Sequence, residues 1–190
     1  IRSSPWHYVR AMKNPKVLGL IMARGGSRSI PKKSIALCAG KPLLYYTAQA
    51  AKRSTLIDRL IISTDDPEMT RVAEENGVEA PFIRPKELAE HDTLDVPVVQ
   101  HAIEWLEKED AYSPDIIVHL RPTTPLKKTE DIDRGITLLL EHEDADSVRS
   151  VCEPMYTPFK MYRGEAKEGE ILVPIMTNVY PEVYAKNSEP

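Results

Sequence analysis

Two glycines and four basic residues lie close together near the start of the chain, directly after an apolar run at 17–23. The set comprises Gly25 and Gly26 together with Arg24, Arg28, Lys32 and Lys33. Glycines let the backbone approach a ligand closely, and free N–H groups in such a turn form an anion-binding concavity. Cations on the same loop would hold a group with several negative charges, and a nucleoside triphosphate fits that description. The loop is therefore predicted to be the phosphate site of an enzyme.

This loop could also be an ordinary polar connection between a strand and a helix. Crowded lysines and arginines repel one another unless they are solvated or bound to an anion, which favours the phosphate site. The loop is not a Walker A motif, because Lys33-Ser34 lacks the preceding glycine, and no Gly-x-Gly-x-x-Gly occurs. The prediction therefore rests on the placement of the charges and the glycines.

The elements that must position this loop alternate between strands and helices from Val17 onward. Apolar runs predict strands at 17–23, 59–63, 78–83, 115–120 and 146–152. Helices are expected at about 41–52, 67–75, 95–108 and 129–142, with Asn76-Gly77 and Thr129 as caps. This alternation predicts an α/β fold of three layers, a mostly parallel sheet with helices on both faces. The loops 24–34, 64–67 and 121–127 each follow a strand, so they are expected to meet in one crevice.

Composition narrows the class of protein. The chain has 190 residues and a net charge of -4, so it has no general basic surface and nucleic acid is not an expected partner. No apolar run reaches the length of a membrane span and the start lacks a signal-peptide core, which predicts no membrane contact and a cytoplasmic location. Cys38 and Cys152 lack metal-site spacing and are expected to be reduced, partly buried thiols.

Three regions are expected along the chain. Residues 1–16 are a polar, proline-broken arm, residues 17–152 the α/β domain, and residues 153–190 a Pro- and Tyr-rich excursion with short β-prone runs. The chain begins at Ile1 rather than Met and ends at Pro190 without a stop signal, which suggests a fragment.

Four segments stand out when taken in order: ARGGSRSIPKKSI with AGKPLLYYT after it, LIISTDDPEM, APFIRPKELAEHDT and LRPTTPLKKTEDID. Together they resemble the acylneuraminate (sialic acid) cytidylyltransferases and their relatives that activate other nonulosonic acids. The resemblance implies a Rossmann-like nucleotidyltransferase fold and a homodimer formed through a small β-rich dimerisation excursion at 153–190. It also implies transfer of CMP from CTP to the anomeric hydroxyl of an acidic nine-carbon sugar, with Mg²⁺ bridging phosphate oxygens.

The resemblance assigns roles to individual residues. Arg24 and Lys33 would be catalytic, because they would stabilise the charge that grows on the leaving pyrophosphate. The nucleotide would be bound by Met22, Ala23, Gly25, Gly26, Ser27, Arg84, Asp92 and Thr93. The sugar would be bound by Arg121, Thr123 and Thr124. The metal-binding aspartates of the family follow a segment that resembles 184–187, where this chain ends, so no metal ligand is assigned.

Some residues depart from the family pattern. Ser29 stands where relatives prefer glycine, Ser34 where they prefer asparagine, and Arg121 where they usually carry glutamine. In relatives, several serines often follow the loop beside the base, whereas this chain has Leu-Asp-Val-Pro at 94–97. Cytosine remains the expected base. Arg121 has two readings: it binds the sugar carboxylate through two parallel hydrogen bonds, or it pairs with strand-end carbonyls or a neighbouring Asp.

Other polar residues have a structural reading beside the functional one. Arg84 is either a nucleotide contact or an exposed loop arginine. Asp65 and Asp66 could form a metal pair, but neighbouring aspartates in an extended segment point to opposite sides, which favours a helix start. His91 and His101 are acid–base candidates, and His101 is expected in the core because it lies on an apolar helix face.

Three functions stay open on this reading. A cytidylyltransferase for a nonulosonic acid is the leading hypothesis. A nucleotidyltransferase of the same fold with another sugar acid or base is the second. The third is a non-catalytic relative that binds a nucleotide or a sugar, and it rests on the departures at Ser29, Ser34 and Arg121.

Overall fold

The computed structural model describes residues 14–27, 30–142 and 144–151. The chain divides into two compact units, Ile1–Arg149 and Ser150–Pro190. All of the described helices and strands belong to the first unit. The excursion predicted at 153–190 lies outside the described residues, as do Arg28, Ser29 and Cys152.

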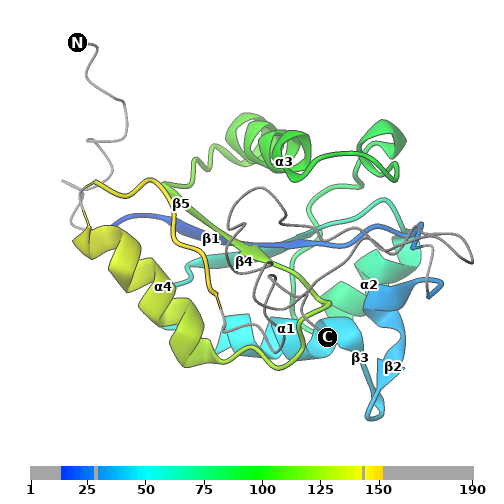
Figure 1. Ribbon diagram of the computed structural model, residues 1–190. Coiled ribbons are helices and arrows are strands. Elements are labelled where there is room, and N and C mark those ends of the chain that lie inside the picture. The colour runs from blue at the N-terminus through cyan, green and yellow to red at the C-terminus, as the bar shows by residue number, and fades with distance from the viewer. Residues whose placement is uncertain (1–13, 28–29, 143, 152–190) are drawn as a thin grey trace, which may run out of the picture. The chain divides into compact units, whose positions relative to one another are not determined.

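Three parallel strands form the main sheet, in the order β4-β1-β5 (Figure 1). Their bounds are Val17–Met22 for β1, Arg59–Ser63 for β4 and Ile116–Leu120 for β5. In the central strand β1, Leu20 lies opposite Ile61 on one side and His119 on the other. The first five residues of β1 are buried, as a parallel strand covered on both faces requires. The strands predicted at 17–23, 59–63 and 115–120 and the predicted α/β class are thus confirmed.

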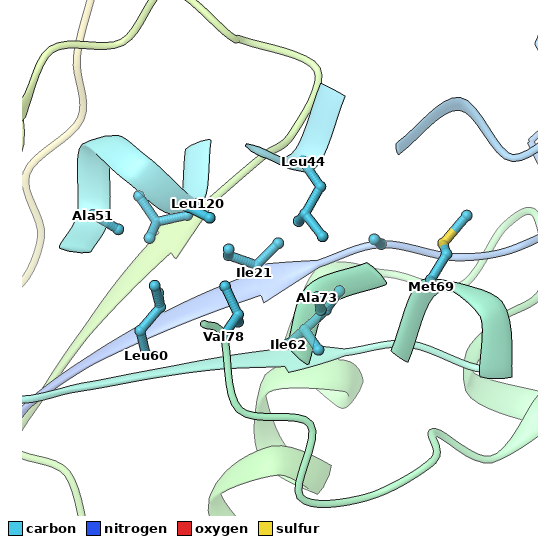
Figure 2. Packing of buried hydrophobic residues seen from close by; sticks show 11 residues of the cluster. Ile21, Leu44, Ala51, Leu60, Ile62, Met69, Ala73, Val78 and Leu120 are labelled. Atoms are coloured by element: carbon cyan, nitrogen blue, oxygen red, sulfur yellow. The ribbon is translucent and has the colours of Figure 1, made fainter. Parts of the chain in front are cut away.

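In the described part of the chain, four α-helices pack against this sheet (Figure 1). Their bounds are Leu43–Lys52 for α1, Pro67–Glu75 for α2, Asp95–Asp110 for α3 and Thr129–Glu141 for α4. Alternate residues of the strands face opposite layers, so the core forms on both faces. Figure 2 shows the cluster on one face, where α1 and α2 pack on the strands through Ile21, Leu44, Leu60, Ile62 and Met69. The opposite cluster packs α3 on the sheet through Leu18, Leu20, Ile61, Ala102 and Leu106.

Two of the predicted strands are wrong. Residues 78–83 make only one isolated bridge, Glu79 with Ile61, in which the amides of Ile62 and Glu79 each donate across the pair. Pro81 has no N–H with which to continue the pairing. The described part of 146–152 contains no strand, and Val148 and Val151 are exposed, so no burial holds the run in a sheet.

A small antiparallel hairpin takes up the first two residues of the predicted helix at 41–52. It pairs β2 (Leu37–Cys38) with β3 (Lys41–Pro42), and α1 begins only after Pro42. The turn between them has positive φ at both Ala39 and Gly40, which suits a two-residue hairpin. Cys38 lies in this hairpin and is exposed, so the expectation of a partly buried thiol is wrong there.

Two of the three predicted caps are confirmed. Asp66 caps α2 by accepting hydrogen bonds from the amides of Glu68 and Met69, at 2.8 and 3.3 Å. After Asn76, the chain leaves the helix through Gly77 at φ +72°. Thr129 is not an N-cap, because its hydroxyl donates to the carbonyl of Ala50 at 2.9 Å and so ties α4 to α1.

Candidate functional site

A cleft of about 400 Å³ lies where the loops after β1 and β5 approach the loop that precedes α3. It lies beyond the carboxyl ends of these parallel strands, the usual ligand position in such a sheet. The predicted crevice is therefore present, with one correction. Of the three loops expected to meet there, 64–67 does not line the cleft but supports the first loop from behind, since Asp65 accepts a hydrogen bond from the amide of Gly25 at 2.9 Å.

The loop after β1 forms one wall of the cleft. The predicted residues that line it are Met22, Ala23, Arg24, Ser27 and Lys33. Gly25 and Gly26 are not among the lining residues. A Cβ on Gly25 would lie 3.0 Å from Oδ2 of Asp66, so a larger residue here would crowd the side chain that caps α2. The structure thus gives Gly25 a packing reason that the glycine-turn argument did not foresee.

The described cations of this loop differ in their partners. Lys32 turns away to ion pairs with Asp66 at 3.1 Å and Glu68 at 2.5 Å, and its hydrogen bond to Glu68 raises its pKa. Arg24 donates to the backbone carbonyl of Glu90 at 2.8 Å. Within the described part of the chain, neither Arg24 nor Lys33 forms an ion pair with a carboxylate. The positive charges of Arg24 and Lys33, which both line the cleft, are therefore not neutralised by a carboxylate of the described residues.

Arg84 lines the cleft from the neighbouring loop and is only 5% exposed. Its Nε donates to the hydroxyl of Ser63 at 2.9 Å, and its Nη2 donates to the carbonyl of the same residue. Burial is the main cause that lowers the pKa of Arg84, and the charge of Arg24 acts in the same direction. Among the described residues no carboxylate forms an ion pair with it. The reading as an exposed loop arginine is wrong.

The rest of the loop before α3 is divided between the cleft and its own contacts. Thr93 lines the cleft, whereas Asp92 does not. His91 also lines the cleft. His101 does not, and instead packs its ring edge-on against the core residue Phe82, at 4.9 Å between centroids; it is half-buried, so its core prediction is confirmed only in part.

Arg121, Pro122 and Thr123, which follow β5, line the opposite side of the cleft. Arg121 forms an ion pair with Asp95 through its Nη2, so the second reading of this arginine, pairing with a neighbouring Asp, is the one observed. Thr124 does not line the cleft, because its hydroxyl donates to the carbonyl of Arg121 at 3.0 Å inside the loop.

Lys127 holds this loop in place, and sequence reasoning missed it. Its ammonium donates to the carbonyls of Arg121 and Thr124, both at 2.9 Å, and to the hydroxyls of Thr124 at 2.7 Å and Thr47 at 3.4 Å. Burial lowers its pKa. A lysine that is satisfied by neutral oxygens acts as a clamp between the loop and α1.

His119 and Asp95 were also missed, although both line the cleft. The signal for His119 is a polar residue within the apolar strand sequence IIVHL, close to a predicted binding loop. The other lining residues that the prediction did not assign are Ser34, Leu88, Glu90, Val98 and Pro122.

The described residues offer no ready metal centre. No group of three or more His, Cys, Asp or Glu side chains gathers among them. Asp65 and Asp66 are occupied by the amide of Gly25 and by the cap of α2, so the metal-pair reading fails. None of the described helices has the length and apolar character needed to cross a membrane.

The chain is similar to known cytidylyltransferases over the residues that line the cleft. The cytidylyltransferase family model matches residues 18–172. A pseudaminic acid cytidylyltransferase of Campylobacter jejuni is 36% identical over 70% of this chain and 55% of its own length. A CMP-N,N'-diacetyllegionaminic acid synthase of Legionella pneumophila is 33% identical over 65% of this chain and 53% of its own. The chain thus spans about half the length of these relatives.

A solved structure of a CMP:2-keto-3-deoxy-manno-octonic acid synthetase complexed with CTP has a similar fold. Its TM-score is 0.56 at 21% identity, over 68% of this chain and 49% of that one. The similarity concerns the fold alone. Because the family model covers most of the chain, including every residue that lines the cleft, the protein belongs to the cytidylyltransferase family.

Proposed function

We propose that the full protein transfers CMP from CTP to the anomeric hydroxyl of a nonulosonic acid and releases pyrophosphate. One observation carries the proposal: Arg24, Lys33 and Arg84 meet at one cleft without a carboxylate ion pair among the described residues. Uncompensated positive charge in a partly buried cleft favours a polyanionic ligand. The relatives from Campylobacter and Legionella are named for pseudaminic and legionaminic acids, which supports an acidic nine-carbon sugar as acceptor.

Each side of the cleft has a role in this proposal. Arg24 and Lys33 bind the phosphates and neutralise the charge that grows on the leaving pyrophosphate, while Arg84 contributes a fixed positive charge. The other nucleotide contacts are assigned to Met22, Ala23, Ser27 and Thr93, which line the cleft; Gly25, Gly26 and Asp92, which were predicted beside them, do not line it. The sugar contacts are assigned to Arg121 and Thr123, which line the cleft; Thr124, also predicted, does not line it. Catalysis then consists mainly of holding the hydroxyl in line with the α-phosphorus.

The family resemblance brings Mg²⁺ into this proposal, and the described residues do not form a site for it. They contain no cluster of three potential ligands, and Asp65 and Asp66 already have partners. No described residue is therefore proposed as a metal ligand.

We also propose that the protein is a cytoplasmic homodimer. Light scattering over a range of concentrations would test the dimer.

The test is substrate turnover with detection of pyrophosphate. Purified full-length protein is titrated with CTP, GTP and UTP by calorimetry, then assayed with CTP, Mg²⁺ and pseudaminic, legionaminic and sialic acids. The proposal predicts preferential CTP binding and pyrophosphate release with at least one of the acids. Tight CTP binding without turnover on any acid would favour a binding protein, and preference for another nucleotide would favour a different transferase.

A further inference from the structure

A histidine and an aspartate on the sugar side of the cleft have no role in the assignments above. His119 is the fourth residue of β5, and its side chain is 31% exposed at the cleft. Asp95 is the first residue of α3 and lines the same cleft. His119 Nδ1 and Asp95 Oδ2 lie 4.0 Å apart. An imidazole, a carboxylate and the guanidinium of Arg121 therefore meet where β5 ends.

The proposed reaction requires a group that accepts a proton. A sugar hydroxyl is a poor nucleophile until its proton is removed, and a base works best when its pKa lies near the working pH. Arginine and lysine lining the cleft are protonated and cannot accept a proton. Carboxylates, which Asp95 and Glu90 bring to the cleft, are in general weaker bases than imidazole, and Asp95 already pairs with Arg121. Among the described lining residues, His91 and His119 are the remaining choices.

Position separates the two histidines. His91 follows Glu90, whose carbonyl binds Arg24 on the nucleotide side of the cleft. His119 lies two residues before Arg121, on the side assigned to the sugar. The hydroxyl that attacks belongs to the sugar, so His119 is the better placed of the two.

The charges around His119 suit a base. Burial is the largest effect on its pKa and lowers it, with Arg121 and Lys127 acting in the same direction and Asp95 opposing them. The imidazole is therefore neutral at pH 7 and has one nitrogen free to accept a proton. Once protonated, it would be stabilised by the carboxylate of Asp95 on α3, as paired carboxylates stabilise catalytic imidazolium groups.

We propose that His119 is the general base of CMP transfer and that Asp95 is its positioning residue. This inference rests on the proposed function. The imidazole takes the proton of the anomeric hydroxyl while the sugar oxygen forms a bond to the α-phosphorus of CTP. The bond from that phosphorus to the bridging oxygen of pyrophosphate breaks, and pyrophosphate leaves with its electron pair. The imidazolium then releases its proton to water.

The test compares H119Q with H91Q, and with H142Q as a matched control at the exposed end of α4. Pyrophosphate release by the full-length protein is measured from pH 5.5 to 9 with CTP and an acceptor that supports turnover. H119Q should lower kcat by about 10²- to 10⁴-fold, while the Kd of CTP stays within about twofold.

The pH profile is the second readout. At pH values below 6.5 the kcat/KM of the wild type should decrease, and H119Q should lose this pH dependence. D95N should move the fall to lower pH, because the carboxylate that raises the pKa of His119 is gone.

A second variant guards against loss of folding. H119A should be partly rescued by added imidazole, which a merely structural role would not allow. The inference is overturned if H119Q keeps the wild-type rate or its pH dependence, if H91Q loses that dependence instead, or if imidazole restores nothing to H119A that still binds CTP. Wild-type protein that turns over no acceptor would overturn the proposed function itself, and the base assignment with it.

Discussion

At the residue scale, the protein separates cations that serve the fold from cations that remain for a ligand. Lys32 is exposed and neutralised by two carboxylates at the start of α2. Arg84 is buried and hydrogen-bonded to the neutral oxygens of Ser63. A buried charge without a counter-charge costs free energy. An anion bound in the cleft would therefore offset the cost of burying the Arg84 guanidinium.

R24A and K33A should each lower turnover by about 10²- to 10³-fold with the fold intact. The reason is that each removes a positive charge that stabilises the leaving pyrophosphate. Steady-state kinetics and thermal unfolding check this expectation. K32A is the matched control, since Lys32 pairs with Asp66 and Glu68 and should have little effect on turnover. Normal rates in both R24A and K33A would show that the loop is not the phosphate site.

The stability of the protein should fall as the pH drops through 6.5. Burial lowers the pKa of His101, and also that of His119, below the ordinary histidine value of 6.5. Below that pH the unfolded chain takes up protons that the folded state does not bind, so the unfolded state gains stability. Urea unfolding at pH 7.5 and 5.5 measures the effect. H101Q should weaken the pH dependence and H142Q should keep it; an unchanged dependence in H101Q would contradict the expectation.

At the element scale, the loop after β5 depends on an interaction with α1. Lys127 bonds the carbonyls of Arg121 and Thr124 and reaches Thr47, which is fully buried in α1. The hydroxyl of Thr47 also donates to the carbonyl of Arg121, at 3.4 Å. These contacts fix the segment that presents Arg121 and Thr123 to the cleft.

K127M should raise the KM of the sugar acceptor about tenfold or more and leave the Kd of CTP within about twofold. Loss of the charged donor should also lower the free energy of unfolding by about 1–3 kcal/mol. Initial-rate kinetics with each substrate varied in turn separates the two effects. K128M is the control, because Lys128 is exposed and its side chain makes no hydrogen bond among the described residues. Equal losses for both substrates in K127M would argue against a local role in the acceptor loop.

At the scale of the whole molecule, the cleft is lined by loops from three separate parts of the chain around one sheet. A ligand that contacts all of them binds only the folded state, so it stabilises the entire unit. Ligand binding and the stability of the fold are therefore linked through Arg84, which lines the cleft and is hydrogen-bonded to Ser63 of β4.

CTP should raise the melting temperature, and R84A should abolish most of that rise. At a hundredfold excess over its Kd, a ligand adds about 2.7 kcal/mol to stability. Differential scanning fluorimetry with CTP and GTP measures the shift. K41M is the matched control, since Lys41 lies in the β2–β3 hairpin and does not line the cleft. A full CTP shift in R84A would remove Arg84 from the nucleotide site.

Local patterns account for the parts of the fold that were predicted well. The apolar runs of β1, β4 and β5 and the Asp66 cap of α2 depend on nearby residues, so they can be read from the sequence. The failed strand at 78–83 had the right composition, but Pro81 and a single bridge to Ile61 decided its pairing.

The sequence by itself determined the α/β class, the phosphate-loop prediction and the family resemblance, because each is written in contiguous residues. Only the tertiary structure decided which cations face the cleft, that Arg84 is buried, and that Arg121 pairs with Asp95. It alone brought His119 beside Asp95 and Lys127 beside Thr47. Those relations join residues far apart in the chain, and they depend on register, burial and the approach of loops that no local pattern encodes.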